Sequence, residues 1–276
     1  MTAAGLAPSL AGALNRWFAQ RELAWCGAAL LVLVPVGLAW AKLDVRTVNG
    51  EAVGLKPTRF ALSIGVYMLT ASWMVGYVRP ERLTSLPVRA TVWMMIVGCA
   101  VELLLITLQA ARAKQSHFNI STPTDAGIYA TMGLFAVLFI GAVLPLAWEV
   151  ARRPRPGVDP VMVWAIVAGL VLTFLIGGGT GGYMSRSFTH AVGPEGWRLP
   201  LFGWSFRSGD IRIPHFFGIH AMQALPLIAG AAQLARGRAG ALLFAVGALG
   251  YAALMLGLLH QALRGRPPVS ALAAAA

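Results

Sequence analysis

The sequence predicts an all-α fold, a polytopic transmembrane bundle of about seven helices that forms one integral membrane domain over residues 1–276. The first observation is composition, because 58% of the residues are hydrophobic and 12% are charged, whereas soluble domains carry about 25% charged residues. The second is that apolar runs of about 20 residues, the length that crosses a bilayer, recur along the chain. The third is that short segments rich in arginine and proline, such as ARRPRPGVDP, separate these runs.

The apolar runs define the expected spans. They cover residues 24–41, 60–78, 91–111, 126–149, 161–183, 214–235 and 239–262. A long outer loop, residues 184–213, joins the fifth span to the sixth. The first run is interpreted as a retained span and not as a signal peptide, because about 22 residues precede it and it is long for the apolar part of such a peptide.

The charged residues indicate a membrane partner. The net charge is +12, from 22 lysines and arginines against 10 acidic residues, and the basic residues are spread over short loops where they fix topology and meet anionic lipid. The sequence contains no zinc-finger spacing and no long basic run, so nucleic acid is not an expected partner. The short arginine-rich loops predict a cytoplasmic N-terminus in a bacterial inner membrane.

The second span carries hydroxyl groups on one face. Ser63, Tyr67 and Thr70 recur at i, i+4 and i+7, a spacing that in membranes serves helix packing. Tyr67 is also a candidate pocket residue. Lys56 and Arg59 stand at the outer end of this span, where long basic side chains extend toward lipid headgroups or contribute to an anion site.

The third span has a polar stripe. Glu102, Gln109, Arg112 and Ser116 fall within roughly 80° of one another on a helix. Glu102 is expected near the bilayer midplane, where an ionisable group costs about 3 kcal/mol or more and indicates a functional site. The alternative is that a protonated Glu102 bonds to a neighbouring helix and only fixes its packing.

The segment after the third span supplies three more polar candidates. His117 and Asn119 follow where the helix ends, and Asp125 stands at the start of the fourth span. Asp125 is expected to cap that helix or to point into a pocket. The two cysteines, Cys26 and Cys99, lie in apolar segments and are interpreted as small core residues.

The sixth span begins with a second polar stripe. On a continuous helix, Arg212, His215, Gln223 and His220 share one arc, while Asp210 lies near the helix start. Pro214 suits the first helical turn, and the helix N-terminus favours an anion. The last span adds a histidine near the same membrane face, His260. All five histidines of the chain are therefore expected toward one side of the membrane.

The segments LKPTRFALSIGVYMLT, ARAKQSHFNISTPTD, GDIRIPHFFGIHAMQALPL and HQALRGRP resemble parts of bacterial polytopic membrane proteins of about seven spans that have no assigned activity. The resemblance covers most of the chain. It implies a polytopic membrane fold and no particular activity, cofactor or site.

The first functional hypothesis is a membrane redox protein that holds haem b or another metal cofactor. Axial histidines from facing helices would ligate the haem near the membrane boundary, with His220 and His260 as the first pair and His215 or His117 as substitutes. Arg212 and Arg112 would meet the propionates. The glycines of GGGTGGYMSR, at the end of the fifth span, would admit the macrocycle.

A second hypothesis is a metal-dependent enzyme. His117, His215 and His260 would bind a zinc-like transition metal, with Asp125 or Asp210 as the fourth ligand.

A third hypothesis is a proton-coupled transporter or a sensor of a small anion or lipid, in which Glu102 carries the proton. A structural accessory subunit of a membrane complex remains the alternative. The further residues of the expected pocket are Glu102, Gln109, Asn119, Asp210, Gln223 and Tyr67.

Overall fold

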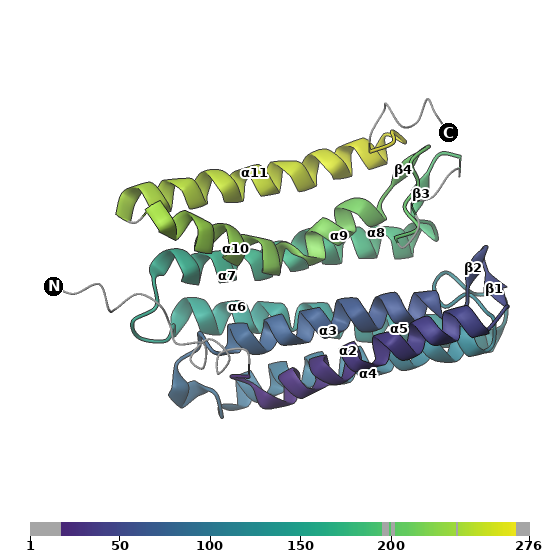
Figure 1. The fold of residues 1–276 in the computed structure, drawn as a ribbon, viewed down its shortest axis with the longest axis horizontal. Helices are drawn as coiled ribbons and strands as arrows, with labels where there is room; N and C mark the ends of the chain where they lie inside the picture. The colour runs from purple at the N-terminus through teal and green to yellow at the C-terminus, as the bar shows by residue number, and fades with distance from the viewer. Residues whose placement is uncertain (1–17, 195–198, 200–201, 236, 269–276) are drawn as a thin grey trace. The chain divides into compact units, whose positions relative to one another are not determined.

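A computed structural model of the chain describes residues 18–194, 199, 202–235 and 237–268 (Figure 1). The described chain is 74% helical with almost no sheet, which confirms the predicted all-α fold. Five helical segments are long and apolar enough to cross a membrane, and this indicates a membrane-embedded protein. They are Arg21–Leu43, Leu86–Ala111, Pro123–Arg152, Pro160–Ser187 and Gly237–Leu263.

Helices also cover the two other predicted spans, but neither helix is both long enough and apolar enough to cross a membrane. The span predicted at 60–78 corresponds to helix α3 (Leu55–Val75), whose apolar character is reduced by Lys56, Arg59 and several hydroxyl side chains. The span predicted at 214–235 is divided into α9 (Arg212–Ile219) and α10 (Ala221–Ala232), which meet at His220. The structure thus supports five spans where the sequence predicted about seven.

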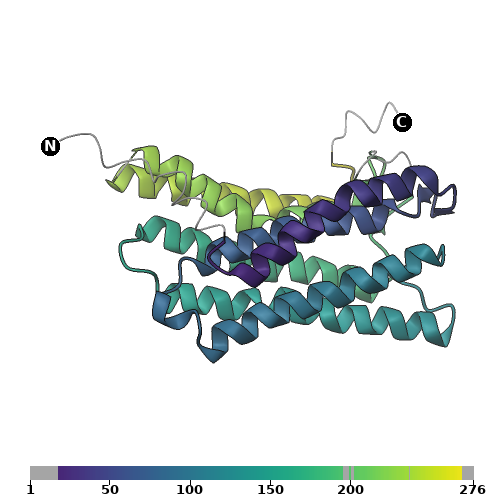
Figure 2. The same ribbon diagram turned by 60° about the horizontal axis from the view of Figure 1, so that its bottom comes forward.

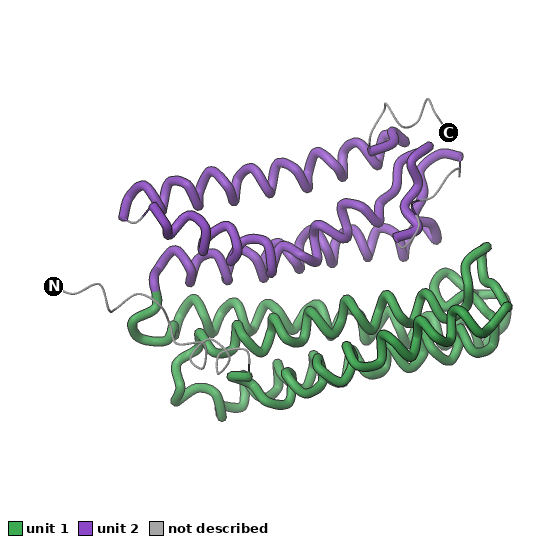
Figure 3. Tube along the Cα trace, in the orientation of Figure 1, with its two compact units in different colours: residues 1–158 green, residues 159–276 purple. Residues whose placement is uncertain are grey.

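The chain divides into two compact units, Met1–Val158 and Asp159–Ala276 (Figure 3). Unit 1 contains α2 (Arg21–Leu43), β1 (Thr47–Val48), β2 (Glu51–Ala52), α3, η1 (Pro80–Arg82), α4 (Leu86–Ala111), α5 (Pro123–Gly141) and α6 (Val143–Arg152). Unit 2 contains α7 (Pro160–Leu172), η2 (Thr173–Gly178), α8 (Gly179–Ser187), β3 (Ala191–Val192), β4 (Gly209–Asp210), α9, α10, η3 (Gln233–Ala235) and α11 (Gly237–Leu263).

In unit 1, helices α2 and α3 pack together through glycines. A Cβ atom added at Gly27 would lie 2.8 Å from the carbonyl oxygen of Gly65, so only residues without a side chain allow this approach. The antiparallel hairpin β1–β2 connects the two helices. Its turn residues, Asn49 and Gly50, both have positive φ, as the tightest hairpin turns require.

The hairpin end of unit 1 is fixed by ion pairs. Arg46 pairs with Asp44 at 2.7 Å and also donates to the carbonyl oxygen of Ala111, where α4 ends. The Arg46 guanidinium holds the pKa of the Asp44 carboxyl well below its usual range. Arg59 of α3 pairs with Glu51 of β2 at 2.7 Å. The ends of α2, α3 and α4 are therefore held together at this end of the unit.

The opposite end of unit 1 is organised around Glu149 of α6. Its buried carboxylate accepts from Arg82 at 2.7 Å and from Arg153 at 3.1 Å. Val78 and Pro154 form an isolated bridge beside this cluster. The two arginines, which the sequence suggested only as determinants of topology, therefore also connect the loops at the ends of α3 and α6.

In unit 2, helix α10 packs against α7 and α11, and α10 and α11 lie side by side in both views (Figures 1 and 2). Ala165, Leu225 and Ala229 form a buried cluster between these helices. The predicted loop 184–213 contains the end of α8 and the paired strands β3 and β4. Few residues of α11 are buried, and an apolar helix with so much exposed surface is suited to contact with lipid.

Candidate functional site

The most unusual polar group in unit 1 is the carboxyl of Glu102. It belongs to α4, a helix long and apolar enough to span a membrane, and its side chain is 7% exposed. One oxygen, Oε1, lies 3.5 Å from Nε2 of His117. The other, Oε2, is buried and has no hydrogen-bond partner within the described part of the chain. A buried unsatisfied oxygen is costly, and more so when it carries charge, so burial disfavours the ionised form of this carboxyl unless a donor reaches Oε2.

His117 reaches Glu102 because the chain turns back after α4. Ala113 and Phe118, on either side of this turn, both adopt positive φ, a conformation that is uncommon for residues other than glycine. Ser116 is buried within the same segment. This conformation brings the imidazole back toward the helix that the chain has just left.

The other nitrogen of His117 faces a lysine. Nζ of Lys56, in the first turn of α3, lies 3.2 Å from Nδ1 of His117, and the hydroxyl of Ser116 lies 3.1 Å from the same atom. Because an ammonium group only donates, Nδ1 accepts from Lys56 and Nε2 carries the proton that faces Glu102. Glu102, His117 and Lys56 therefore form a line of ionisable groups from the inside of unit 1 toward its hairpin end.

A second polar cluster surrounds Asp125, whose side chain is completely buried. Oδ1 accepts from Arg112 at 2.9 Å and from Gln109 at 3.1 Å, and Oδ2 accepts from Lys114 at 2.8 Å. Thr122 caps α5 by accepting from the Asp125 amide, and its hydroxyl donates to Oδ2. The helix cap is thus Thr122, whereas Asp125 was the residue expected to cap, and the Asp125 carboxylate is occupied by cations.

The polar stripe predicted on the third span is therefore divided between two clusters. Glu102 joins His117, while Gln109 and Arg112 turn to Asp125. The helix wheel assumed that the helix continues past residue 112, but α4 ends at Ala111. Arg112 was assigned to a haem propionate, and its guanidinium instead lies against a buried carboxylate.

The side chains of Asn119 and Tyr67 bond to groups other than the Glu102 carboxyl. The amide of Asn119 donates to the carbonyl oxygen of Gln115 and accepts from Ser121, so this side chain stabilises the loop. The hydroxyl of Tyr67 donates to the carbonyl oxygen of Phe139 at 3.4 Å, and the two rings pack at 4.5 Å. Both residues therefore have structural roles in unit 1.

Unit 2 contains a second group of polar residues where two helices depart from regular geometry. Between α7 and α8 the residues Thr173–Gly178 form a π-helix, a feature that occurs frequently at functional sites. The facing helix is interrupted at His220. The hydroxyl of Thr173 accepts from the amide of Met222 and donates to the carbonyl oxygen of Ile219, so it satisfies backbone groups at the interruption.

The two histidines of this region make different contacts. Nδ1 of His215 donates to the carbonyl oxygen of Gly177 at 2.9 Å, with the Thr180 hydroxyl at 3.1 Å. Nδ1 of His220 donates to Oε1 of Gln223 at 3.3 Å. The predicted arc is only partly formed, because the interruption at His220 changes the rotation of every residue that follows it.

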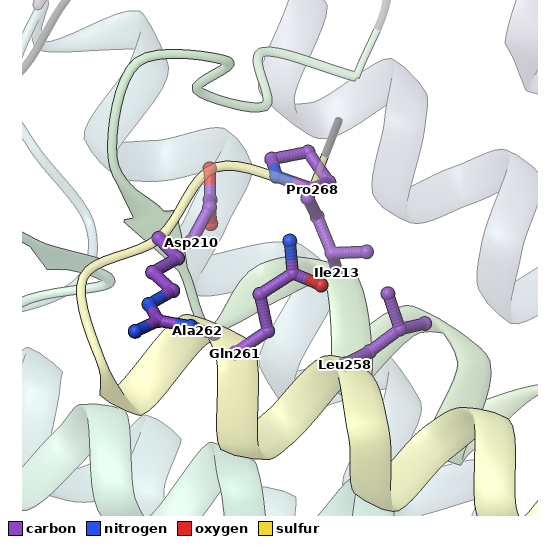
Figure 4. A pocket seen from close by; sticks show the side chains of 7 residues that line it. Asp210, Ile213, Leu258, Gln261, Ala262 and Pro268 are labelled. Atoms are coloured by element: carbon purple, nitrogen blue, oxygen red, sulfur yellow. The ribbon is translucent and has the colours of Figure 1, made fainter. Parts of the chain in front are cut away.

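Arg212 does not belong to the histidine group. Its guanidinium pairs with Asp210 at 2.6 Å, and Asp210 also accepts from the Ser205 amide. Asp210 lines a cavity of ≈ 10 Å³ with Ile213, Leu258, Gln261, Ala262, Arg266 and Pro268 (Figure 4). A space of this size holds about one water molecule. Arg212 and Asp210 therefore stabilise the start of α9, and the cavity that Asp210 lines is too small for a cofactor.

The structure separates the histidines that were proposed as haem ligands. The Tyr251 hydroxyl of α11 donates to the carbonyl oxygen of Phe217, and Gly209 lies against Ala262, so α9 and α11 run in opposite directions. His260 lies roughly 13 Å beyond Tyr251 along the helix axis, and His220 lies on the other side of Phe217. His260 is also exposed. One haem cannot take both as axial ligands in this arrangement.

The proposed metal ligands are not gathered either. Across the ranges that the structure describes, no group of three or more His, Cys, Asp or Glu side chains is placed to hold a metal ion. Of the predicted set, His117 and Asp125 belong to unit 1, and His215 and His260 belong to unit 2.

The close approach of η2 and α9 predicts that a side chain added at the contact will destabilise the protein. A Cβ atom added at Gly218 would lie 2.6 Å from the amide nitrogen of Gly177. Because these backbone atoms cannot move aside freely, Gly218→Ala is expected to cost about 1–3 kcal/mol of stability, measured by thermal unfolding in detergent. Gly230→Ala, in α10, is the matched control because its added Cβ meets nothing within 4 Å. Equal stability of the two variants would contradict this packing.

Comparisons with known protein families, with curated proteins and with solved structures found no match to this chain. Any functional inference therefore depends on the residues and contacts described above. The contact between Lys56 and His117 was not predicted from the sequence, because most of α3, η1 and all of α4 lie between the two residues. Lys114 was not predicted as a partner of Asp125 either.

Proposed function

We propose that the protein is a proton-coupled transporter of a small anion, with Glu102 as the group that carries the proton. The observation that carries this proposal is the buried Glu102 carboxyl, one oxygen of which has no hydrogen-bond partner within the described part of the chain. An ionisable group inside a membrane span indicates a functional site. A proton on this carboxyl removes the charge that burial makes costly, and loss of that proton restores a charge that must be compensated.

His117 and Lys56 support a route for the proton. The imidazole lies between the two, at 3.5 Å from Glu102 and 3.2 Å from Lys56. A histidine that accepts at one nitrogen and faces a carboxyl with the other can pass a proton by exchanging its two sites. This route leads from the buried carboxyl to a lysine at the hairpin end.

The charge at the hairpin end supports an anion as the transported ligand. Asp125 is matched by two cations, Arg112 and Lys114, and Lys56 adds a third positive group beside His117. The local charge is therefore positive when Glu102 is protonated. A surface of this kind raises the local concentration of anions, and the proton on Glu102 would accompany the anion.

Unit 2 provides the second observation in favour of transport. Its π-helix and the interrupted pair α9–α10 pack against each other through Gly177 and Gly218. Discontinuous helices are typical of the substrate regions of transporters.

We also propose that the protein lies in the bacterial inner membrane with about seven spans and a cytoplasmic N-terminus. Short loops rich in arginine support this orientation. The hairpin end of unit 1, with Lys56 and His117, would then face the non-cytoplasmic side.

Proton flux into proteoliposomes tests the transport proposal. Purified protein is reconstituted with a pH-sensitive dye inside, the membrane potential is held at zero, and chloride, nitrate or phosphate is added outside. We expect at least one anion to acidify the interior faster than in vesicles without protein. Equal rates with and without protein for all three anions would count against the proposal.

A further inference from the structure

The end of unit 1 that is organised around Glu149 is strongly basic. Two chain segments form it, 76–89 and 148–158, and we call it the arginine end. Their six arginines and two glutamates, with no lysine or aspartate, give a net charge of +4. The arginines are Arg79, Arg82, Arg89, Arg152, Arg153 and Arg155. All of them are exposed except the partly buried Arg82, so most of this charge lies at the surface.

The two segments of the arginine end are fixed to each other by backbone hydrogen bonds. The amide of Arg79 donates to the carbonyl oxygen of Arg153 at 3.0 Å, and the amide of Arg155 donates to the carbonyl oxygen of Tyr77 at 2.7 Å. Nη1 of Arg155 also donates to the carbonyl oxygen of Gly76 at 3.3 Å. An arginine influences topology by its charge alone, whereas these arginines lie on a paired backbone. Their charges are therefore held close together before any ligand binds, which lowers the cost of binding.

Glu149 orients two of the guanidinium groups without using all of their donors. Its carboxylate accepts from Nε and Nη2 of Arg82 and from Nη1 of Arg153. Each guanidinium has five N–H groups, so both keep donors for another ligand. The planar arrangement of these donors matches the oxygens of a phosphate group.

Helix α6 adds an apolar surface beside these charges. Leu144, Trp148 and Arg152 recur at i, i+4 and i+8, so they lie on one face of the helix, and all three are exposed. Cζ of Arg152 lies 5.0 Å from the centre of the Trp148 ring, a cation–π contact. The helical segment that ends at Arg152 is long and apolar enough to cross a membrane, and tryptophan is enriched at the level of lipid headgroups. This face therefore changes from apolar to cationic where headgroups would lie.

We propose that the arginine end binds an anionic glycerophospholipid, with the headgroup phosphate on the arginines and an acyl chain along Trp148 and Leu144. This inference is independent of the transport proposal. A lipid fits better than a free phosphate ion because a cationic and an apolar surface adjoin here, and the ion would use only the first. An anionic lipid fits better than a zwitterionic one, since the positive group of a zwitterionic headgroup is repelled by the net positive charge.

Native mass spectrometry of the full chain in detergent tests this proposal. The protein is titrated with phosphatidylglycerol and, in parallel, with phosphatidylcholine that has the same acyl chains, and the affinity for the first bound lipid is measured. A third series adds glycerol phosphate, which carries the headgroup phosphate without acyl chains. The variants are Arg152→Gln and Trp148→Leu, because both leave the ion pairs of Glu149 in place. Arg186→Gln is the matched control, since Arg186 is an exposed arginine in the last turn of α8, in unit 2.

We expect phosphatidylglycerol to bind more tightly than phosphatidylcholine and to stay bound in the presence of glycerol phosphate. Arg152→Gln should weaken phosphatidylglycerol binding about fivefold, the effect of one basic residue at an anionic lipid surface. Trp148→Leu should weaken the binding of both lipids, and Arg186→Gln should weaken neither.

Equal affinity for the two lipids would overturn the proposal. Displacement of the lipid by equimolar glycerol phosphate would also overturn it, and would indicate a site for free phosphate. So would equal losses in Arg152→Gln and Arg186→Gln, which would mean that any surface arginine has the same effect. If a variant does not fold, the comparison of the two lipids on the unmodified protein still decides the question.

Discussion

Glu102→Gln is expected to lower anion-dependent proton flux by about 10²-fold or more, the contribution typical of a positioned proton-transfer group. Glutamine keeps the size and the burial of the side chain, but it cannot gain or lose a proton. The carboxyl is 3.5 Å from His117, so the substitution leaves the imidazole in place and removes its proton-exchanging partner. The measurement is the initial rate of dye acidification in proteoliposomes at equal protein density.

Glu51→Gln is the matched control for this substitution. Glu51 lies in the β1–β2 hairpin, at the end of unit 1 where Lys56 also lies. Its carboxylate pairs with Arg59 at 2.7 Å and makes no contact with the Glu102 and His117 pair that the described contacts record. We expect it to retain flux. If Glu102→Gln kept the full rate, Glu102 would be a packing residue and not a proton carrier.

Asp125→Asn is expected to cause a large loss of stability. The carboxylate is completely buried and accepts from Arg112, Lys114, Gln109 and Thr122. An asparagine offers one carbonyl oxygen and an amide that itself donates, so two cations lose their counter-charge. Removing one partner of a buried ion pair is strongly destabilising, and we expect the Tm in detergent to fall by roughly 10 °C.

A second substitution separates charge from shape at this site. Adding Lys114→Met to Asp125→Asn removes one of the uncompensated cations, so the double variant should recover part of the lost Tm. Asp159→Asn, at the exposed cap of α7, is the control because asparagine caps a helix as well as aspartate does. An unchanged Tm in Asp125→Asn would mean that the cluster contributes no stability.

The helices of this protein could be predicted from composition and apolar run length, but their interruptions could not. A helix wheel assumes a continuous helix, and it placed Arg212, His215, His220 and Gln223 on one arc. The structure interrupts that helix at His220. The interruption depends on Thr173, a residue of another helix that satisfies the freed backbone groups. The sequence around His220 does not indicate that Thr173 will pack against it.

The partner of Glu102 was hidden for a similar reason. The polar stripe on the third span made Glu102 a candidate, and the structure buries it. His117 reaches it only because Ala113 and Phe118 adopt left-handed backbone conformations. Neither residue type favours such a conformation, so the turn could not be inferred from the sequence. Burial of an acidic residue follows from position along a helix, whereas its contacts depend on how distant segments fold together.

The π-helix between α7 and α8 constrains the number of residues in this segment, independently of which residue types it contains. A π-helix bonds residues five apart where an α-helix bonds residues four apart, so Thr173–Gly178 accommodates additional chain within the same helix. A one-residue deletion that restored α-helical geometry would rotate everything after it by about 100°. Thr180 would then turn away from His215, which its hydroxyl meets at 3.1 Å. In related chains we therefore expect this segment to tolerate changes in residue type more readily than changes in length.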